Sequence, residues 1–525
     1  MLTRRNFLRV LGGTAGLTLG GSRLLLDSVA RAATQPILTS SATGIDHVVV
    51  LMLENRSFDH LLGWLPGADG KQDGTYPALD GNTYPNYPLA PDFQGCGYSD
   101  PDHSWEGWLV QNDNGALDGF LRRPTAPPSP PSGAPAAATN TFPVGYYTNL
   151  DPGGGPKAVP DVPVLGALAQ QYTVIDRYFA SFAGETYPNR FYQHSARTDR
   201  DHNSTTTTTL PAIWDQLSPV PGTGKPTGAY FFKDVPFLAL WGTKYLGFWR
   251  PYVAGQSLPG LGVLPGLSFL DSVQQGLLPN VSFLDPAFED EGTGTSGDYH
   301  PLCDIRVGEK FVADVYHALH DAGYLASTVL MITFDEWGGF YDHVAPPTVT
   351  DDTDPATVDH SNNNRPPGFP GPNHPDYTQL GFRVPAIVVS DFAPRQVVSG
   401  GPFEHTSTLA FIESLFGLNH LTGRDANAVN LGTVLAGTAR TDDPASAIPT
   451  SAQVPGPATG LAAACSVNST RSVSPDPLPP AEVPEFPLPA VAGAVFAGGA
   501  GLAALGARYR ARAEAVAEAA AESAV

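Results

Sequence analysis

The sequence predicts an α/β fold built on a mainly parallel β-sheet with flanking helices. Two apolar runs carry this prediction, VVVLML at Val48–Leu53 and VLMIT at Val329–Thr333. Continuous runs of β-branched and aliphatic residues suit strands that are buried on both faces, as in a parallel sheet. Helices are expected over Gly308–Ala322 and, as an amphipathic helix, over Thr408–Phe416. A hydrophobic fraction of 42% in 525 residues is sufficient for a large core.

Polar residues follow each apolar run directly. Glu54 and Asn55 come after the first run, and Asp335 and Glu336 come after the second. In open α/β sheets, ligands bind at the carboxyl ends of the strands, so these four residues are expected to meet at one edge of the sheet. Carboxylate and amide oxygens are the ligands that hard divalent cations prefer. The pattern indicates a metal-assisted hydrolase.

The N-terminus has the pattern of an export signal. Thr3–Leu8 reads TRRNFL, a Gly-rich apolar stretch follows over Val10–Leu26, and Ala30-Arg31-Ala32 offers a small-x-small cleavage site. These three features in this order predict a twin-arginine signal peptide over residues 1–33, with the twin-arginine translocase as a partner. The alternative is an ordinary amphipathic N-terminal helix.

The C-terminus has a second membrane-related pattern. Phe486–Ala507 contains no charged residue, and arginines follow at positions 508, 510 and 512. A segment of this length with a basic flank predicts a transmembrane segment and a cytoplasmic tail over 508–525. A processed sorting signal and a buried hairpin or core helix are the alternatives. The chain is therefore expected to be exported and held at the cell surface, or released outside the cell.

Composition divides the remaining chain. Residues 40–440 are expected to form the catalytic domain. Residues 441–485 are rich in Pro, Ala, Ser and Thr without periodicity, which predicts a linker. The net charge of −22 argues against nucleic acid as a partner and against adsorption to an anionic membrane surface. Cys96, Cys303 and Cys465 allow one disulfide in an exported protein, and their spacing matches no zinc pattern.

Several polar clusters lie in loops punctuated by Gly and Pro, where catalytic groups are often found. Each cluster also has a structural explanation. A single histidine is more often a hydrogen-bonded structural residue, and Thr186 could simply be a helix N-cap. The clusters are Asp102–Trp105 (DHSW), Asn114–Phe120 (NGALDGF), Gly184–Arg190 (GETYPNR), Asp298–Pro301 (DYHP) and Phe403–Ser407 (FEHTS).

Taken together, these motifs resemble one family. ENRSFDH, HSW with DGF, TYPNR, HP, TFDEWGGFYDHVAPP and RVPAIVVSDFAPR with EHTSTLAFIESLFG occur in this order from about residue 46 to about residue 425. They resemble the bacterial phosphoesterase family of acid phosphatases and non-haemolytic phospholipases C. The resemblance implies an alkaline-phosphatase-like fold, a doubly wound and mainly parallel sheet with its site at the strand carboxyl ends.

The resemblance also implies roles for particular residues. Thr186 matches the nucleophile position, and His103 and His300 match histidines that line the phosphate pocket. A divalent metal ion of unknown identity is expected on Glu54, Asn55, Thr186, Asp335 and Glu336. Further residues that lie in matching motifs and could belong to the pocket are Asn189, Arg190, His343 and His405.

The implied chemistry is phosphoester hydrolysis through a phosphothreonine intermediate. A metal ion can neutralise the phosphoester and activate the hydroxyl of Thr186, and histidines can donate to phosphoryl oxygens or protonate the leaving group. The substrate is expected to be that of an acid phosphatase or a phospholipase C. No long C-terminal extension follows the motifs, which favours a small phosphomonoester. Trp337 stands where many relatives have His or Asn, and Asp298–Pro301 departs from the usual Glu-His-Pro.

Two other functions are alternatives. A sulfatase on the same fold needs Cys or Ser to make its aldehyde nucleophile, and Thr186 cannot form it. A catalytically inactive, surface-anchored binding protein would suit the predicted linker and anchor. The presence of every residue expected at the metal site favours an enzyme.

Overall fold

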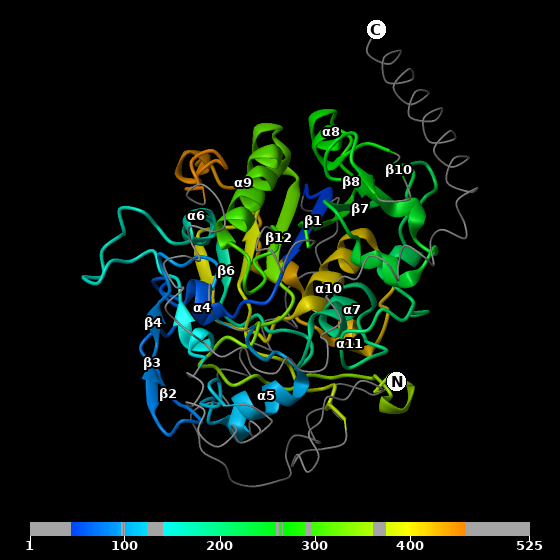
Figure 1. Cartoon of the computed structure of the whole chain (residues 1–525). Helices are drawn as coiled ribbons and strands as arrows, with labels where there is room; N and C mark the ends of the chain where they lie inside the picture. Colours follow the sequence, from blue (N-terminus) through cyan, green and yellow to red (C-terminus); the bar gives the residue numbers. More distant parts are fainter. Residues whose placement is uncertain are drawn as a thin grey trace, which may run out of the picture. The chain divides into compact units, whose positions relative to one another are not determined.

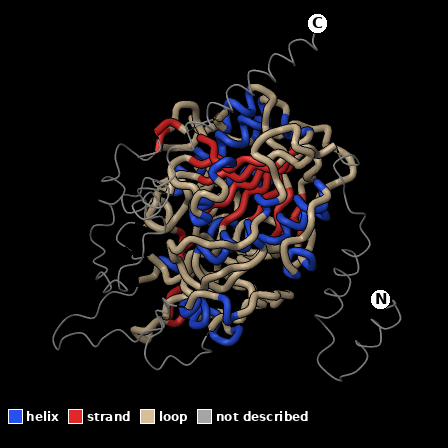
Figure 2. Tube along the Cα trace, turned by 90° about the vertical axis from the view of Figure 1, so that its right-hand side faces the viewer, coloured by secondary structure: helices blue, strands red, loops and turns tan. Residues whose placement is uncertain are grey.

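An eight-stranded sheet in the order β14-β6-β13-β12-β1-β11-β7-β8 forms the centre of the structure (Figures 1 and 2). The computed structural model describes residues 44–456, apart from 96, 97, 99, 123–139, 259–261, 265, 289–295 and 361–373. The strands of this sheet are β1 (His47–Leu53), β6 (Thr173–Ile175), β7 (Gly228–Phe232), β8 (Trp249–Pro251), β11 (Val281–Asp285), β12 (Thr328–Phe334), β13 (Ala386–Val389) and β14 (Gln396–Val398).

The sheet is mainly parallel, as the sequence predicts. β12, β1, β11, β7 and β8 pair in parallel, and β6 pairs in parallel with β14. β13 runs antiparallel to both of its neighbours, β12 and β6. The carboxyl ends of β1, β11 and β12 therefore lie at the same edge.

The two predicted strands lie side by side in the middle of the sheet. All seven residues of β12 are buried, and every residue of β1 after His47 is buried. The two strands are in register from His47 opposite Thr328 to Leu53 opposite Phe334. Burial on both faces explains why these strands are continuous apolar runs rather than alternating patterns.

Helices cover both sides of the sheet (Figure 1). α6 (Pro163–Gln171) and α8 (Phe269–Gln274) pack on α9 (Ile305–Asp321), while α7 (Thr186–Ser195) and α11 (Gly423–Asn427) pack on α10 (His405–Phe416). The predicted helices over 308–322 and 408–416 are confirmed as α9 and α10. Each begins three residues earlier than predicted, because the carboxylates of Asp304 and Glu404 accept backbone hydrogen bonds at the N-caps.

A smaller layer of irregular chain covers the carboxyl ends of β1 and β12. It contains α4 (Phe58–Leu62), α5 (Trp105–Asn112) and two small ladders, β2 (Thr75–Pro77) with β3 (Thr83–Pro85) and β4 (Tyr87–Pro88) with β5 (Gly145–Tyr146). A third ladder joins β9 (Ser257–Leu258) to β10 (Gly262–Val263). In the covering layer, the buried rings of Trp105, Trp108 and Trp337 belong to an aromatic cluster that is separate from the main core.

The described part of the chain extends beyond the predicted domain boundary at residue 440. Ile448 and Val454 each have 2% of their surface exposed and belong to the main core. Arg306 of α9 donates to the carbonyl oxygen of Gly456 at 3.3 Å. Ile448 and Val454 therefore pack on the core within the segment that the sequence predicts to be a linker.

The expected export and anchoring segments lie outside the described residues. This applies to the signal peptide over 1–33, the linker from 457 onward, the segment Phe486–Ala507, the tail over 508–525, and both Cys96 and Cys465. Within the residues that are described, no helix has the length and hydropathy needed to cross a bilayer.

Candidate active site

Glu54 and Asp335 mark the ends of the two central strands. Because Leu53 and Phe334 are opposite each other in the register, the next residues of both strands emerge together. The backbone N–H of Asn55 donates to Oδ1 of Asp335 at 3.1 Å. Asn55 has a left-handed backbone with φ of 60°, which Asn tolerates better than most residues. The two strand ends therefore meet at one edge of the sheet, as the sequence predicts.

Gly338 fixes how the turn after β12 packs on the turn after β1. Its φ is 62°, and a Cβ atom there would lie 2.0 Å from the backbone oxygen of Asn55. The N–H of Gly338 donates to Oε2 of Glu336 at 2.6 Å. Glycine is required here because the two turns touch through backbone atoms, and this close contact also holds the Glu336 carboxylate.

Thr186 begins helix α7 and points its hydroxyl at the first strand end. The Thr186 hydroxyl donates to Oδ1 of Asn55 at 3.3 Å, and Thr186 is fully buried. Asn203, from a loop that follows α7, supplies a cap: its Oδ1 accepts from the N–H of Tyr187 at 2.8 Å. The N–H of Asn203 donates in turn to the carboxylate of Glu185, the N-cap residue. Thr186 thus lies at the positive end of a helix that is held in place from outside.

Arg190, one turn further along α7, joins three strand ends. Its guanidinium contacts Glu54 at 2.8 Å, Asp285 at 3.1 Å and Asp335 at 3.2 Å, with all four side chains buried. Burial lowers the pKa of Arg190, but the charges of Glu54, Asp335 and Asp285 outweigh it and raise the pKa above its ordinary value. Arg190 is therefore a fixed cation that gathers the ends of β1, β11 and β12.

The strand ends gather several buried acidic side chains. Three carboxylates share the one guanidinium of Arg190, and a fourth buried carboxylate, Glu336, follows Asp335 in the chain. Burial raises the pKa of Asp285 to about 6, because the charged carboxylate loses its hydration there. Negative groups outnumber the positive one in a buried region, and the oxygens of Glu54, Asn55, Thr186, Asp335 and Glu336 are of the type that a divalent cation binds.

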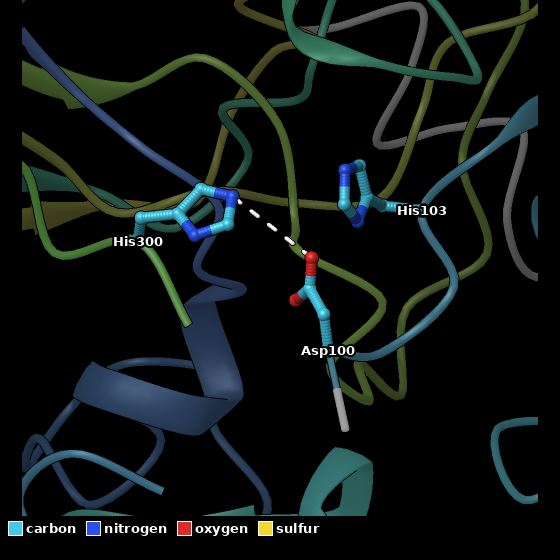
Figure 3. Close-up of side chains that lie close together, drawn as sticks. All are labelled: Asp100, His103 and His300. Carbon is cyan, nitrogen blue, oxygen red and sulfur yellow. Dashed lines mark ion pairs between the residues drawn. The ribbon is translucent and has the colours of Figure 1, made fainter. Parts of the chain in front are cut away.

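His103 and His300 lie near each other, as expected for two residues of one pocket, and a third residue joins them. Figure 3 shows Asp100 pointing its carboxylate toward the space between the two imidazole rings. Nε2 of His300 lies 4.0 Å from Oδ2 of Asp100, and the two ring centroids are 6.3 Å apart. Possible ligand atoms of all three residues lie within 4.8 Å of one another.

The loops that carry this histidine pair contact the strand-end turns. The guanidinium of Arg56 donates to the carbonyl oxygen of His300 at 3.2 Å, and the N–H of Glu54 donates to the carbonyl oxygen of Asp298 at 2.8 Å. Gly339 is so close to the 101–102 segment that a Cβ there would lie 2.6 Å from the backbone oxygen of Asp102. The acidic strand ends and the histidine pair therefore belong to one region at the sheet edge.

Asn189 and His405, two of the possible pocket residues, support the site from behind. The side chain of Asn189 accepts from the N–H of Phe182 at 2.8 Å and donates to the carbonyl oxygen of Gly184 at 2.8 Å, which fixes the loop before Thr186. Nε2 of His405 donates to the carbonyl oxygen of Asp335 at 2.7 Å. Burial lowers the pKa of His405 to about 4, so its ring is neutral at physiological pH.

His343 belongs to a different charge cluster. Its Nδ1 lies 2.6 Å from a carboxylate oxygen of Asp59, and its Nε2 lies 3.1 Å from Asp69. Arg383 completes the cluster through Asp59 at 3.1 Å and Asp342 at 2.9 Å. These contacts tie the loop around Asp69 to the turn after β12, so we assign His343 to the support of that turn.

Trp337 is fully buried. Its Nε1–H donates to Oε1 of Gln111 at 2.8 Å, and its ring packs on Phe382 with centroids 5.4 Å apart. The aromatic ring therefore lies behind the acidic turn, within the covering layer.

Three residues of the site were not singled out in the sequence. Asp285 ends β11 after the apolar run VSFL, the same strand-end signal that identified Glu54 and Asp335. Asp100 stands two residues before DHSW, and Asn203 follows Asp201-His202 in a polar loop. Asp100 and Asn203 have no local sequence signal, because their partners are far away in the chain.

Comparison with known proteins supports the resemblance. The profile of the phosphoesterase family matches residues 45–227 and 258–419. The chain belongs to the phosphoesterase family. It is 31% identical to non-specific phospholipase C6 of Arabidopsis thaliana over 427 residues, which cover 76% of this chain and 74% of that protein. It is 30% identical to phospholipase C B of Mycobacterium tuberculosis over 474 residues, which cover 81% of this chain and 84% of that protein.

This phosphoesterase is accordingly a hydrolase that acts on phosphoric esters. The comparisons give no support to the two alternatives, a sulfatase and an inactive binding protein. Among solved structures, it is similar to a protein of the alkaline phosphatase superfamily from Vibrio parahaemolyticus. That comparison gives a TM-score of 0.33 at 10% identity and covers 78% of both chains.

Proposed function

We propose that this phosphoesterase hydrolyses its substrate through a phosphothreonine at Thr186, with a divalent cation on Glu54, Asn55, Thr186, Asp335 and Glu336. The observation that carries the proposal is the Thr186 hydroxyl, which starts helix α7 and donates to Asn55 at 3.3 Å beside the acidic strand ends. A nucleophile at a helix N-terminus lies where backbone dipoles favour an anionic phosphoryl group.

Each residue of the site has a separate role in the proposed reaction. The Oγ1 of Thr186 attacks phosphorus, the leaving alkoxide departs on the opposite side, and water then cleaves the phosphothreonine. When bound, the cation supplies positive charge that lowers the pKa of the hydroxyl and polarises a phosphoryl oxygen. Arg190 keeps Glu54 and Asp335 in place. We assign to His103 and His300 the contacts with the phosphoryl oxygens and the protonation of the leaving alkoxide.

We propose a phospholipid as the substrate, cleaved in the manner of a phospholipase C. Both relatives named above are phospholipases C, and the alignment spans 84% of the mycobacterial one. The sequence motifs lead us to expect a small phosphomonoester, whereas the alignment over most of the mycobacterial relative supports a phospholipid. The alternative, a phosphomonoester, differs in the leaving group and not in the attack by Thr186.

The nucleophile is tested with Thr186→Ala. We expect turnover to fall by about 100-fold or more, because removing a catalytic group typically costs at least that factor. The melting temperature should stay close to that of the wild type, and Thr186→Ser should keep measurable activity. Brief exposure to labelled substrate followed by acid quenching should place the label on Thr186. A label at another residue, or an alanine variant with more than about a hundredth of the wild-type rate, would refute the assignment.

The substrate is tested with a panel of p-nitrophenyl phosphate, p-nitrophenylphosphorylcholine and phosphatidylcholine, each across pH and divalent metals. A phospholipase C should release diacylglycerol from phosphatidylcholine with the highest kcat/KM of the three. A clear preference for p-nitrophenyl phosphate would make the protein a phosphomonoesterase.

We further propose that the twin-arginine translocase exports the chain and that the C-terminal segment retains it at the membrane. The support is the sequence TRRNFL at Thr3–Leu8 and the uncharged stretch Phe486–Ala507 with its basic flank. Changing both Arg4 and Arg5 to Lys should leave active protein in the cytoplasm, as cell fractionation would show. Unchanged export of this variant would argue against the twin-arginine route.

A further inference from the structure

The chain on both sides of His300 has an unusual backbone. Tyr299 has φ of 76° and Leu302 has φ of 74°, which places both residues in the left-handed region. Bulky side chains are rare in this region, so such residues are held there by their surroundings and often lie at functional sites. Pro301 restricts His300 itself, because the residue before a proline avoids the helical conformation. The strained backbone that presents His300 therefore requires contacts that hold it.

Tyr299 is anchored through its side chain and through its backbone. It is fully buried, and its hydroxyl donates to Oε1 of Glu309 at 2.5 Å. Its ring lies on helix α9 at Gly308, where a Cβ atom would be 2.2 Å from the ring. Its carbonyl oxygen accepts from Nε of Arg56 at 2.6 Å, and the same guanidinium donates to the carbonyl oxygen of His300 at 3.2 Å. Tyr299 therefore links α9 to the turn after β1, with His300 directly after it in the chain.

Glu309 is a fully buried carboxylate whose partners are uncharged donors. Its Oε1 accepts from the hydroxyl of Tyr299, and its Oε2 accepts from the backbone N–H groups of Val164 and Leu165. Burial raises the pKa of Glu309 to about 7, because these hydrogen bonds only partly offset the loss of hydration. A buried carboxylate without a counter-ion is unfavourable, and an apolar side chain would avoid this cost. The carboxylate at this position of α9 therefore indicates a specific role.

The simplest role for Glu309 is to cap helix α6 from outside. Val162, the N-cap residue of α6, makes no side-chain cap bond, and Glu309 accepts from N–H groups of the first turn. Asn149 supports the same helix start: its Oδ1 accepts from the N–H of Val162 at 3.0 Å, and its side-chain nitrogen donates to the carbonyl oxygen of Val162 at 2.9 Å. The side chain of Asn149 thus serves the start of α6, whereas Glu309 serves both α6 and Tyr299.

We propose that Glu309 and Tyr299 are positioning residues that act on the reaction through His300. The carboxylate of Glu309 fixes the Tyr299 hydroxyl, the buried ring fixes the left-handed backbone, and this backbone sets the direction in which His300 leaves the chain. The inference rests on the proposed function, in which His300 contacts the phosphoryl group or protonates the leaving alkoxide. A displacement of such a group by about 1 Å can lower a rate by about 100-fold. A hydrogen bond made on α9 can therefore control the reaction.

Removing either end of the hydrogen bond between Tyr299 and Glu309 tests the proposal in the full-length protein. Assays at pH 8 lie above the pKa of Glu309. We expect Tyr299→Phe and Glu309→Leu each to lower kcat by at least about 10-fold with little change in KM. In the His300→Gln background neither should lower kcat further, because both act through His300. Asn149→Ala is the matched control for the α6 cap, and it should lower the melting temperature and keep kcat.

Nitrogen NMR of histidine-labelled protein reports the position of His300 without an activity measurement. The signals of the His300 ring are identified by their absence in His300→Gln. Nδ1–H of this ring donates to the carbonyl oxygen of Pro301 at 2.8 Å, so its chemical shift changes when the direction of the ring changes. We expect this signal to move in Tyr299→Phe and in Glu309→Leu, and to stay in place in Asn149→Ala.

Circular dichroism shows whether each variant is folded. If Glu309→Leu is not, Tyr299→Phe decides alone, because it leaves the hydrogen bonds between α6 and Glu309 intact. Further losses of kcat in the His300→Gln background, or an unmoved His300 signal in folded Tyr299→Phe, would overturn the proposal. A failure of the proposed function is distinguishable from this result. A fully active His300→Gln would remove His300 from the reaction, and the His300 signal would then decide whether Tyr299 and Glu309 position it.

Discussion

Arg190 shows how much one buried side chain can organise. A planar guanidinium with five donors reaches Glu54, Asp285 and Asp335 at once, which a lysine ammonium on a flexible stem could not do with the same geometry. The three carboxylates stand on three different strands. The guanidinium offsets part of their mutual repulsion, and the N–H of Asn55 adds a hydrogen bond to Asp335 at 3.1 Å.

The buried carboxyl group of Glu413 predicts that the stability of the fold depends on pH. Burial, together with the nearby carboxylate of Asp425, raises the pKa of Glu413 from 4.5 to about 10. Below pH 4.5 the group is protonated in both folded and unfolded chains. Between pH 4.5 and about 10 the unfolded chain loses the proton and the folded chain keeps it, so stability should fall as pH rises. The slope is at most about 1.4 kcal/mol per pH unit.

Urea unfolding of the wild type and of Glu413→Gln between pH 5 and pH 9, a range chosen to lie inside that window, tests this prediction. The glutamine variant cannot ionise. Its free energy of unfolding should therefore decrease less with rising pH than that of the wild type. Asp442→Asn, at an exposed residue paired with Arg440, serves as a control that should leave the pH dependence nearly unchanged. Parallel curves for the wild type and Glu413→Gln would mean that Glu413 is ionised in the folded protein.

At the scale of elements, helix α7 depends on a residue outside itself. The carboxamide of Asn203 caps the helix at Tyr187, and the same residue donates to Glu185, so the turn that carries Thr186 is held on both sides. We expect Asn203→Ala to lower kcat by about 10- to 100-fold with little change in KM, because small displacements of a nucleophile have effects of this size. Asn203→Asp keeps the accepting oxygen and should restore part of kcat.

Asn430 provides the matched control for Asn203. It accepts from the N–H of Gly432 at 2.8 Å at the start of a short helix over Leu431–Val434. Removing either cap should cost about 1 kcal/mol of stability. Only the Asn203 variant should lose kcat. Equal effects of both variants on kcat would mean that Asn203 acts through stability alone.

The sequence predicted elements better than it predicted their partners. β1 and β12 were evident because complete burial demands continuous apolar runs, and the strand-end position of Glu54 and Asp335 followed from the parallel sheet. The roles of Asp100 and Asn203 were not evident, because they depend on contacts between loops that no local pattern encodes. Asn189 and His405 lay in the right motifs, but their hydrogen bonds are made to the backbone behind the site.

For the molecule as a whole, the end of the packed chain is testable. A protein ending at Gly456 retains Ile448 and Val454 in the core, whereas one ending at Arg440 lacks both. Burying one aliphatic side chain contributes roughly 1.5–3 kcal/mol. We therefore expect the longer form to melt like the full-length chain and the shorter form to melt several degrees lower. Calorimetry of both proteins, with phosphoesterase activity measured in parallel, would decide this. Equal melting temperatures would place the domain boundary at residue 440.

The place of β1 in the sheet has a consequence for biosynthesis. Val48 pairs with Val281 on one side and with Val329 on the other, so the first central strand must wait for partners that leave the ribosome more than 200 residues later. Contacts between such distant parts of a chain make folding slow. During this interval the run VVVLML is an unpaired apolar strand of the kind that promotes aggregation. A newly made chain therefore depends on the shielding of β1 from other chains until β12 has been synthesised.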